Sequence, residues 1–89
     1  MYKVIYSQNS AKDLRKIDKP SAQRIIKKID FFSKQEDVHK FSKPLKEFGS
    51  NKHRFRVGSY RVIFKINRYG ELQILMILNI KHRKNIYLN

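Results

Sequence analysis

The amino-acid sequence predicts an α+β domain in which two helices pack on one face of an antiparallel-rich sheet. Two observations carry this prediction: apolar residues recur at helical spacing in the first third of the chain, and alternating or continuous apolar runs dominate its second half. The expected order is strand, helix, helix and three strands, β-α-α-β-β-β. The chain has 89 residues and neither an internal repeat nor a linker, so residues 1–89 are expected to form one domain.

The N-terminal third contains the predicted first strand and both helices. Residues 2–6 (YKVIY) are β-branched and aromatic, which favours a strand. A short helix follows, with capping side chains offered by Ser7, Asn9 and Ser10 and with apolar residues at positions 11, 14 and 17. Asp18 or Ser21 can cap a second helix, in which Pro20 is tolerated only in the first turn. The apolar stripe of this helix is predicted to face the core: Ala22, Ile25, Ile26, Ile29 and Phe32.

The most informative stretch is 53–64 (HRFRVGSYRVIF), which predicts a β-hairpin around a two-residue type II′ turn at Gly58-Ser59. Such a turn places Arg56 directly opposite Arg61. Because side chains alternate across a strand, the hairpin should have a core face formed by Phe55, Val57, Tyr60, Val62 and Phe64, and a basic face formed by Arg54, Arg56 and Arg61. Opposed like charges destabilise a strand pair. A polyanion would resolve that conflict, since arginine binds phosphate bidentately.

The rest of the second half predicts one more turn and one more strand. Residues 68–70 have the composition of a turn, and residues 71–80 (ELQILMILNI) that of a strand. The apolar run at 74–78 does not alternate, which predicts a central strand covered on both faces. Residues 35–52 lack periodicity, so this segment is expected either to fold over a core edge or to contact a ligand.

The charge balance predicts a polyanionic partner. The chain has 21 Lys and Arg against 7 Asp and Glu, a formal net charge of +14. The imbalance between Lys or Arg and acidic residues is greatest in residues 48–89, which hold nine Lys or Arg and one acid. Such a balance favours attraction to nucleic acid, to an anionic membrane or to an acidic protein.

Several kinds of site are excluded or disfavoured by composition. The chain has no cysteine, which excludes disulfides, cysteine nucleophiles and thiolate metal sites. Its three histidines are far apart, no His or carboxylate pair has ligand spacing, and no glycine-rich phosphate loop is present. We therefore expect no metal and no cofactor. No apolar run of about 18 residues and no signal-peptide pattern occur, so a soluble cytoplasmic protein without a membrane partner is expected.

Two motifs carry a resemblance to a known family. They are RFRVGSYR at 54–61 and His82-Arg83 followed by Tyr87, and the basic segment KPLKEFGSNK at 43–52 precedes the first of them. Together they resemble the RelE/ParE superfamily of toxins from type II toxin–antitoxin modules. The resemblance covers nearly the whole chain, and the family has the same strand–helix–helix–three-strand order.

The resemblance to the RelE branch implies a ribosome-dependent endoribonuclease that enters the A site, cleaves messenger RNA without a metal and so inhibits translation. In that reaction the ribose 2′-hydroxyl attacks the neighbouring phosphate. The resemblance implies that Arg54, Arg56 and Arg61 clamp the phosphate. Arg83 would join them or stabilise the leaving group, and Tyr87 would stack on or orient the base.

The proton-transfer and RNA-contacting residues are less directly indicated. Histidine titrates near neutral pH, which makes His82 the candidate for proton transfer, with Lys43 and Glu47 in reserve. RelE-type enzymes often carry lysine at the positions of Arg54 and Arg56, and arginine is a poor base. Lys81 stands where that branch has an arginine assigned to acid catalysis, and Ser59 and Asn85 stand where many relatives have Asp. The lysines expected to contact RNA are Lys43, Lys46, Lys52, Lys81 and Lys84.

The resemblance also implies a partner and leaves alternative functions open. An acidic antitoxin would wrap a toxin monomer within a hetero-oligomeric complex, drawn in by charge complementarity. One alternative is a ParE-like inhibitor of DNA gyrase that does not cleave RNA. Another is a weakened toxin homologue that mainly binds antitoxin or RNA. In the simplest alternative, the arginines form a solvated sheet face, His82 is an ordinary strand-end histidine and Tyr87 is a packing residue.

Overall fold

The computed structural model describes residues 1–44 and 52–82, except for the side chains of His39 and Phe41. Its elements are β1 (Lys3–Tyr6), α1 (Gln8–Lys16), α2 (Lys19–Ser33), the 3₁₀ helix η1 (Val38–Phe41), β2 (Lys43–Pro44), β3 (Lys52–Val57), β4 (Tyr60–Tyr69) and β5 (Leu72–His82). The predicted α+β class and element order are confirmed. The structure adds η1 and the short β2, both within the segment for which no regular element was predicted, and residues 45–51 of that segment lie outside the described residues.

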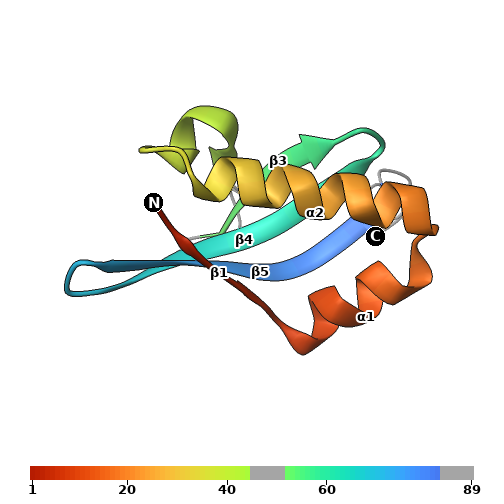
Figure 1. Ribbon diagram of the computed structural model, residues 1–89, viewed down its shortest axis with the longest axis horizontal. Helices are drawn as coiled ribbons and strands as arrows, with labels where there is room; N and C mark the ends of the chain where they lie inside the picture. Colours follow the sequence, from red (N-terminus) through yellow and green to blue (C-terminus); the bar gives the residue numbers. More distant parts are fainter. Residues whose placement is uncertain (45–51, 83–89) are drawn as a thin grey trace.

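The strands form one sheet in the order β1-β5-β4-β3-β2. β1 runs parallel to β5, and every other neighbouring pair is antiparallel. Both helices lie on one face of this sheet, as Figure 1 shows. The strand side chains that point away from the helices form what we call the open face. They belong to residues 3 and 5 of β1, 43 of β2, 52, 54 and 56 of β3, 61, 63, 65, 67 and 69 of β4, and 72, 74, 76, 79 and 81 of β5.

The core lies between the helices and the opposite, helix-covered face. Its centre is aromatic, with ring centroids of Phe32 and Phe55 4.4 Å apart and those of Phe55 and Phe64 4.9 Å apart. Ile25, Ile29 and Phe32 of the α2 stripe are buried as predicted, but Ile26 is 44% exposed, so its assignment to the core was wrong. Successive helix residues are rotated by about 100°, which turns Ile26 out of the interface that buries Ile25.

Both helices begin at the capping residues that the sequence offered. The Ser7 Oγ accepts the Ser10 N–H at 3.0 Å and donates to the Leu78 carbonyl at 2.8 Å, which ties the start of α1 to β5. The Asp18 carboxylate accepts the Ser21 N–H at 3.1 Å at the start of α2. That hydrogen bond holds the pKa of Asp18 below its ordinary value.

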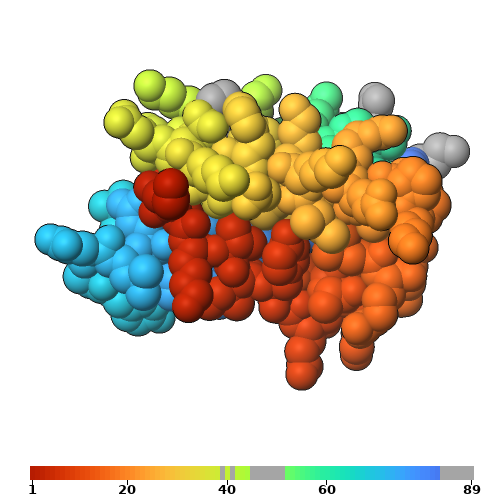
Figure 2. All heavy atoms as spheres, in the orientation of Figure 1, coloured from red at the N-terminus to blue at the C-terminus, as the bar shows by residue number. Residues whose placement is uncertain are grey.

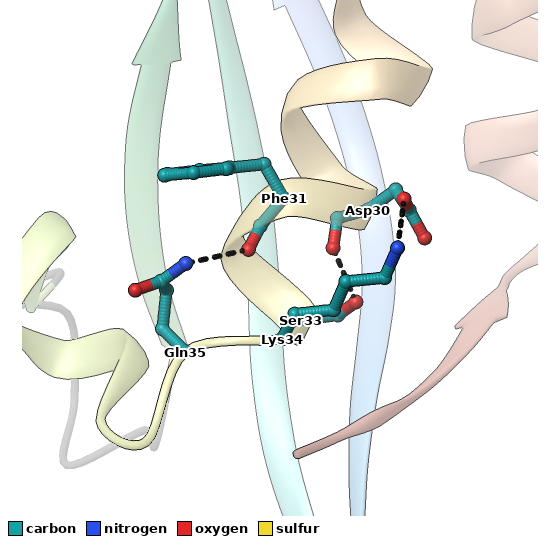
Figure 3. Close-up of polar contacts among 5 residues, drawn as sticks. All are labelled: Asp30, Phe31, Ser33, Lys34 and Gln35. Carbon is teal, nitrogen blue, oxygen red and sulfur yellow. Dashed lines mark hydrogen bonds and ion pairs between the residues drawn. The ribbon is translucent and has the colours of Figure 1, made fainter.

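Side chains satisfy the carbonyls at the C-terminal end of α2, as Figure 3 shows. The Ser33 Oγ donates to the Asp30 carbonyl at 2.6 Å, and the Gln35 Nε2 donates to the Phe31 carbonyl at 3.1 Å. Lys34 Nζ and Asp30 Oδ2 form an ion pair at 3.1 Å. The two hydrogen bonds bring side-chain donors to carbonyls of the last turn, where intrahelical N–H donors run out.

The N-terminal strand is fastened to this end of α2. The Tyr2 N–H donates to the Ser33 carbonyl at 2.7 Å, just before β1 begins. Burial, and then the nearby charge of Asp30, raise the pKa of the Tyr6 hydroxyl in the same strand. Figure 2 shows β1 and the helices covering one side of the molecule, with the β4–β5 hairpin, in blue, extending beyond them at one end.

Two hairpins connect β3, β4 and β5. Gly58 has φ +60°, as the first central position of a primed turn requires, and the predicted opposition of Arg56 and Arg61 is confirmed. The second turn is shorter than predicted, because β4 continues through Tyr69 and β5 starts at Leu72. Placing residues 68 and 69 in the turn was therefore wrong. Gly70, with φ +62°, makes a two-residue connection possible.

Strand β5 is central, between β1 and β4, but it is not covered on both faces. Leu75 and Ile77 are fully buried against the helices, whereas Ile74 and Met76 are only half-buried on the open face. The prediction of two-sided cover from the continuous apolar run was thus wrong. In the described part of the chain, no helix is long and apolar enough to cross a bilayer.

Candidate nucleic-acid interface

The strands carry the basic excess of the chain. No Asp or Glu lies in β1 to β5, whereas nine Lys and Arg do. Eight of the nine lie on the open face: Lys3, Lys43, Lys52, Arg54, Arg56, Arg61, Lys65 and Lys81. Because their charges are of one sign and close together, the open face should have a strongly positive potential that attracts polyanions.

Three of these cations form a row across neighbouring strands. Arg56 of β3 pairs with Arg61 of β4, and Arg61 pairs with Lys81 of β5. Directly paired residues point to the same face, and neighbouring strands are about 4.8 Å apart. We call Arg56, Arg61 and Lys81 the cation row. Its members are close enough for one phosphate group to attract all three.

The members of the cation row differ in exposure. Arg56 is exposed and Lys81 is half-buried, whereas Arg61 in the middle is only 5% exposed. An exposed guanidinium can make bidentate contact with phosphate oxygens. The Arg61 charge lies deeper, where the surroundings screen it less than water does. The row therefore combines accessible cations at its ends with a fixed charge at its centre.

A β-bulge decides which end residue of β5 joins the row. Phe64 pairs with Ile77, but the preceding Ile63 pairs with Asn79, so Leu78 is an extra residue on β5. One extra residue reverses the alternation of every side chain beyond it. Lys81 therefore points to the open face beside Arg61, and His82 points to the helix-covered face.

The structure does not bring His82 together with the three arginines predicted to work with it. His82 pairs with Tyr60, and their rings meet edge to face with centroids 5.1 Å apart. Both rings line a cavity of about 300 Å³ on the α1 side, which Asp13 also lines. The Asp13 Oδ2 accepts the Ile80 N–H at 2.8 Å and so holds this end of β5 in place.

The remaining predicted site residues fall into two groups. Arg54, Lys43 and Lys52 lie on the open face, where Lys43 pairs with Arg54 and Lys52 with Lys65. The others lie outside the described residues: Lys46, Glu47, Arg83, Lys84, Asn85 and Tyr87. Within residues 1–44 and 52–82, no cluster of three or more His, Asp or Glu has the geometry of a metal site.

Two open-face cations, Lys3 and Lys65, were not among the predicted site residues, and for Lys65 the signal was present in the sequence. Extending the predicted hairpin register by two residues beyond position 54 places Lys65 opposite Lys52, as the structure has it. Lys43 could not be placed this way, because its pairing with Arg54 belongs to β2, for which no strand was predicted.

A protein-family model of the ParE toxin of type II toxin–antitoxin systems, parDE, matches residues 4–87. The chain belongs to this toxin family. No curated protein sequence matches the chain significantly.

Solved structures of related toxins share the fold. The toxin is similar to a chain of the archaeal RelE–RelB complex from Pyrococcus horikoshii, with 27% identity, a TM-score of 0.70, and 92% of this chain and 94% of that chain covered. It is similar to a chain of the RelB–RelE antitoxin–toxin complex from Methanococcus jannaschii, with 25% identity, a TM-score of 0.70, and 93% and 94% covered. It also resembles a chain of the RelBE2 toxin–antitoxin complex from Mycobacterium tuberculosis, with 25% identity, a TM-score of 0.64, and 92% and 98% covered.

Proposed function

We propose that this toxin is a ribosome-dependent, metal-independent endoribonuclease that cleaves messenger RNA and thereby inhibits translation. The observation that carries the proposal is the cation row, in which Arg56, Arg61 and Lys81 occupy paired positions on the open face. A sheet that only had to fold would gain nothing from opposing these charges. The similarity to chains of RelB–RelE complexes supports the same choice.

The proposed reaction needs charge stabilisation and two proton transfers. The ribose 2′-oxygen attacks the adjacent phosphorus and loses its proton, and the bond from phosphorus to the 5′-oxygen breaks. The leaving 5′-oxygen takes up a proton, which leaves a 2′,3′-cyclic phosphate and a 5′-hydroxyl. The pentacoordinate transition state carries extra negative charge on the phosphoryl oxygens, and positioned cations stabilise that charge most. Arg56 and Arg61 have this role in the proposal.

Lys81 is the row member suited to proton transfer. A guanidinium hardly gives up its proton, whereas an ammonium group can act as a general acid. The bulge places Lys81 beside Arg61 and turns His82 away, so we assign protonation of the leaving oxygen to Lys81 instead of His82. From the family resemblance, Arg83 would assist the leaving group and Tyr87 would stack on or orient the base.

We further propose that an acidic antitoxin segment covers the open face of a toxin monomer. The eight basic side chains of that face, with no acid among the strands, are complementary to such a segment. An antitoxin bound there would compete directly with RNA for the cation row. Inhibition of the toxin would follow without any change in its fold.

The test is to induce the chain in bacteria and map messenger RNA 5′ ends, comparing Arg56→Gln with Arg15→Gln. Both variants remove one exposed arginine, from the cation row and from α1 respectively. We expect cuts within translated reading frames, about a hundredfold fewer with Arg56→Gln, and undiminished with Arg15→Gln. Cuts should disappear from a reporter transcript whose start codon has been removed. Thermal unfolding of each purified variant checks that it is folded.

A second variant tests the role of Lys81. Lys81→Met removes the ammonium group that can donate the proton but leaves Arg56 and Arg61 in the row, so we expect RNA binding to weaken only slightly while cleavage falls much further. Equal cleavage by Lys81→Met and the wild type would contradict the assignment of Lys81.

The family model favours one alternative function, because it describes the toxin of parDE systems. Growth arrest with intact transcripts and accumulating DNA breaks would replace the ribonuclease proposal with gyrase inhibition. A chain that causes no arrest but binds an antitoxin tightly would be a weakened homologue.

A further inference from the structure

A pocket of about 400 Å³ lies at the β2–β3 edge, beside the cation row. It is lined by Lys40, Ser42, Lys43, Arg54, Phe55 and Arg56. Four of these six residues are cations and none is an acid. Lys43 and Arg54 are directly paired across the two strands, a second opposition of like charges that destabilises the sheet. The pocket therefore contains repulsion that an anion would relieve.

Ser42 adds an unused hydrogen-bonding group to this pocket. Its Oγ is buried and makes no hydrogen bond to any part of the chain that the structure describes. Buried polar atoms nearly always have a partner, because leaving one without a partner costs free energy. Since Ser42 lines the pocket, its hydroxyl can donate to an oxygen of a bound anion.

The spacing along β3 relates the pocket to the cation row. Arg54 and Arg56 are two residues apart on the same face, about 6.6 Å along the strand, and Arg56 belongs both to the row and to the pocket lining. Lys52 continues the same spacing on the same face. Successive phosphates of an extended RNA strand have a comparable separation, whereas one isolated anion needs only one of these positions.

We propose that this pocket binds the phosphate adjacent to the scissile one, so that the RNA backbone runs along β3 from Arg56 toward Lys52. The inference rests on the proposed function, because it takes the same RNA strand as its ligand. Lys43 and Arg54 supply the charge, Lys40 adds to it from η1, and Ser42 donates a hydrogen bond. The pocket thereby makes binding depend on at least two consecutive phosphates.

The test uses a fully 2′-O-methylated RNA trinucleotide, which lacks the attacking hydroxyl and has two internal phosphates. A matched trinucleotide carries a neutral methylphosphonate in place of one phosphate, and each position is tried in turn. The wild type should bind the all-phosphate trinucleotide about tenfold more tightly than at least one of the substituted ones, as expected for the loss of one charge-assisted contact. Binding is measured by NMR titration, which also reports whether each variant is folded.

Lys43→Ala is the diagnostic variant, and Lys12→Ala is its control with the same change in net charge on the exposed surface of α1. With Lys43→Ala, the ratio of affinities for the all-phosphate and the methylphosphonate trinucleotide should fall from about ten to about one or two. The slope of log affinity against log salt concentration should fall by about 0.7, as for one lost phosphate contact on a single strand. Lys12→Ala should keep both the preference and the slope. Ser42→Ala should reduce the preference less than Lys43→Ala does.

Three results would overturn the pocket proposal. Lys43→Ala could keep the preference and the salt slope, as Lys12→Ala is expected to do. It could also weaken the binding of both trinucleotides equally, which would mean that Lys43 only adds general electrostatic attraction. Alternatively, a polyglutamate peptide could bind in a Lys43-dependent manner while the trinucleotide does not, which would assign the pocket to an acidic protein segment. This binding assay is independent of cleavage in cells. Cuts without a Lys43-dependent preference would defeat the pocket proposal alone, and the preference without cuts would defeat the ribonuclease proposal alone.

Discussion

The two faces of the sheet have opposite chemistry although they are made by the same strands. On the helix-covered face, Phe55 and Phe64 are almost fully buried in an aromatic core. Their immediate neighbours Arg54 and Lys65 point to the open face, where no acidic strand residue balances them. The core face stabilises the fold, and the open face opposes it, because paired cations repel. The burial on one face therefore has to offset a repulsion on the other face, which an anionic ligand would relieve.

The largest expected difference between the faces is at two consecutive residues of β4. Phe64→Ala should lower the free energy of unfolding by about 3–5 kcal/mol, because it leaves a cavity in the core. Lys65→Ala should change it far less, by about 0.5 kcal/mol, because Lys65 is half-buried on the open face and is not part of the core. Urea unfolding of both variants measures the contrast. Similar destabilisation by the two substitutions would mean that the open face is also a packing surface.

A smaller effect is expected where the helix layer holds the end of β5. Asp13→Ala should cost about 1–3 kcal/mol, because it leaves the partly buried Ile80 N–H without its acceptor. Asp13→Asn keeps an acceptor oxygen and should cost less. Urea unfolding gives the stabilities, and amide hydrogen exchange at Ile80 should accelerate only with the alanine variant. Unchanged exchange at Ile80 would show that Asp13 does not hold this end of the strand.

The open face should respond with the opposite sign. Arg56→Gln removes a charge directly opposite Arg61 and should raise the free energy of unfolding by about 0.2–1 kcal/mol. The gain should shrink as salt is added, because salt already screens the repulsion between exposed charges. Unfolding curves at low and high salt test both statements. A loss of stability would show that Arg56 contributes to the fold and would weaken the use of this variant as a functional probe.

The smallest effect concerns the cap of α2. Because the folded chain holds the pKa of Asp18 below its ordinary value of 3.8, the carboxylate adds stability above that value, and the contribution disappears as the pH falls through the folded-state pKa. Asp18→Asn still caps the helix but does not titrate. Thermal unfolding between pH 6 and pH 2 should show a shallower acid destabilisation in the variant. Parallel curves for the two chains would contradict the role of this carboxylate.

Local features of the sequence were sufficient for much of the fold. A two-residue turn fixes the register of its hairpin, so the opposition of Arg56 and Arg61 followed from Gly58-Ser59 alone. Ser7 and Asp18 were among the few capping candidates that the sequence offered, because a cap acts within three residues of the helix start, and the structure shows which candidates cap. Ile26 shows the limit of such patterns. It is apolar and was assigned to the buried stripe of α2, yet it is 44% exposed. Its exposure depends on how the helix is rotated about its own axis relative to the sheet.

What the sequence by itself determined was the α+β class, the element order and one strongly basic sheet face, since these follow from short-range periodicity and charge. The tertiary structure decided which residues meet on that face. The bulge at Leu78 exchanges the sheet faces to which the side chains of Lys81 and His82 point. Near it, the Ile80 N–H donates a hydrogen bond to Asp13, 67 residues away in the chain. Alternation within a strand is local, but the point at which it is interrupted depends on packing against distant elements. For the same reason, only the folded chain brings Lys43 to Arg54 and buries Arg61 at the centre of the cation row.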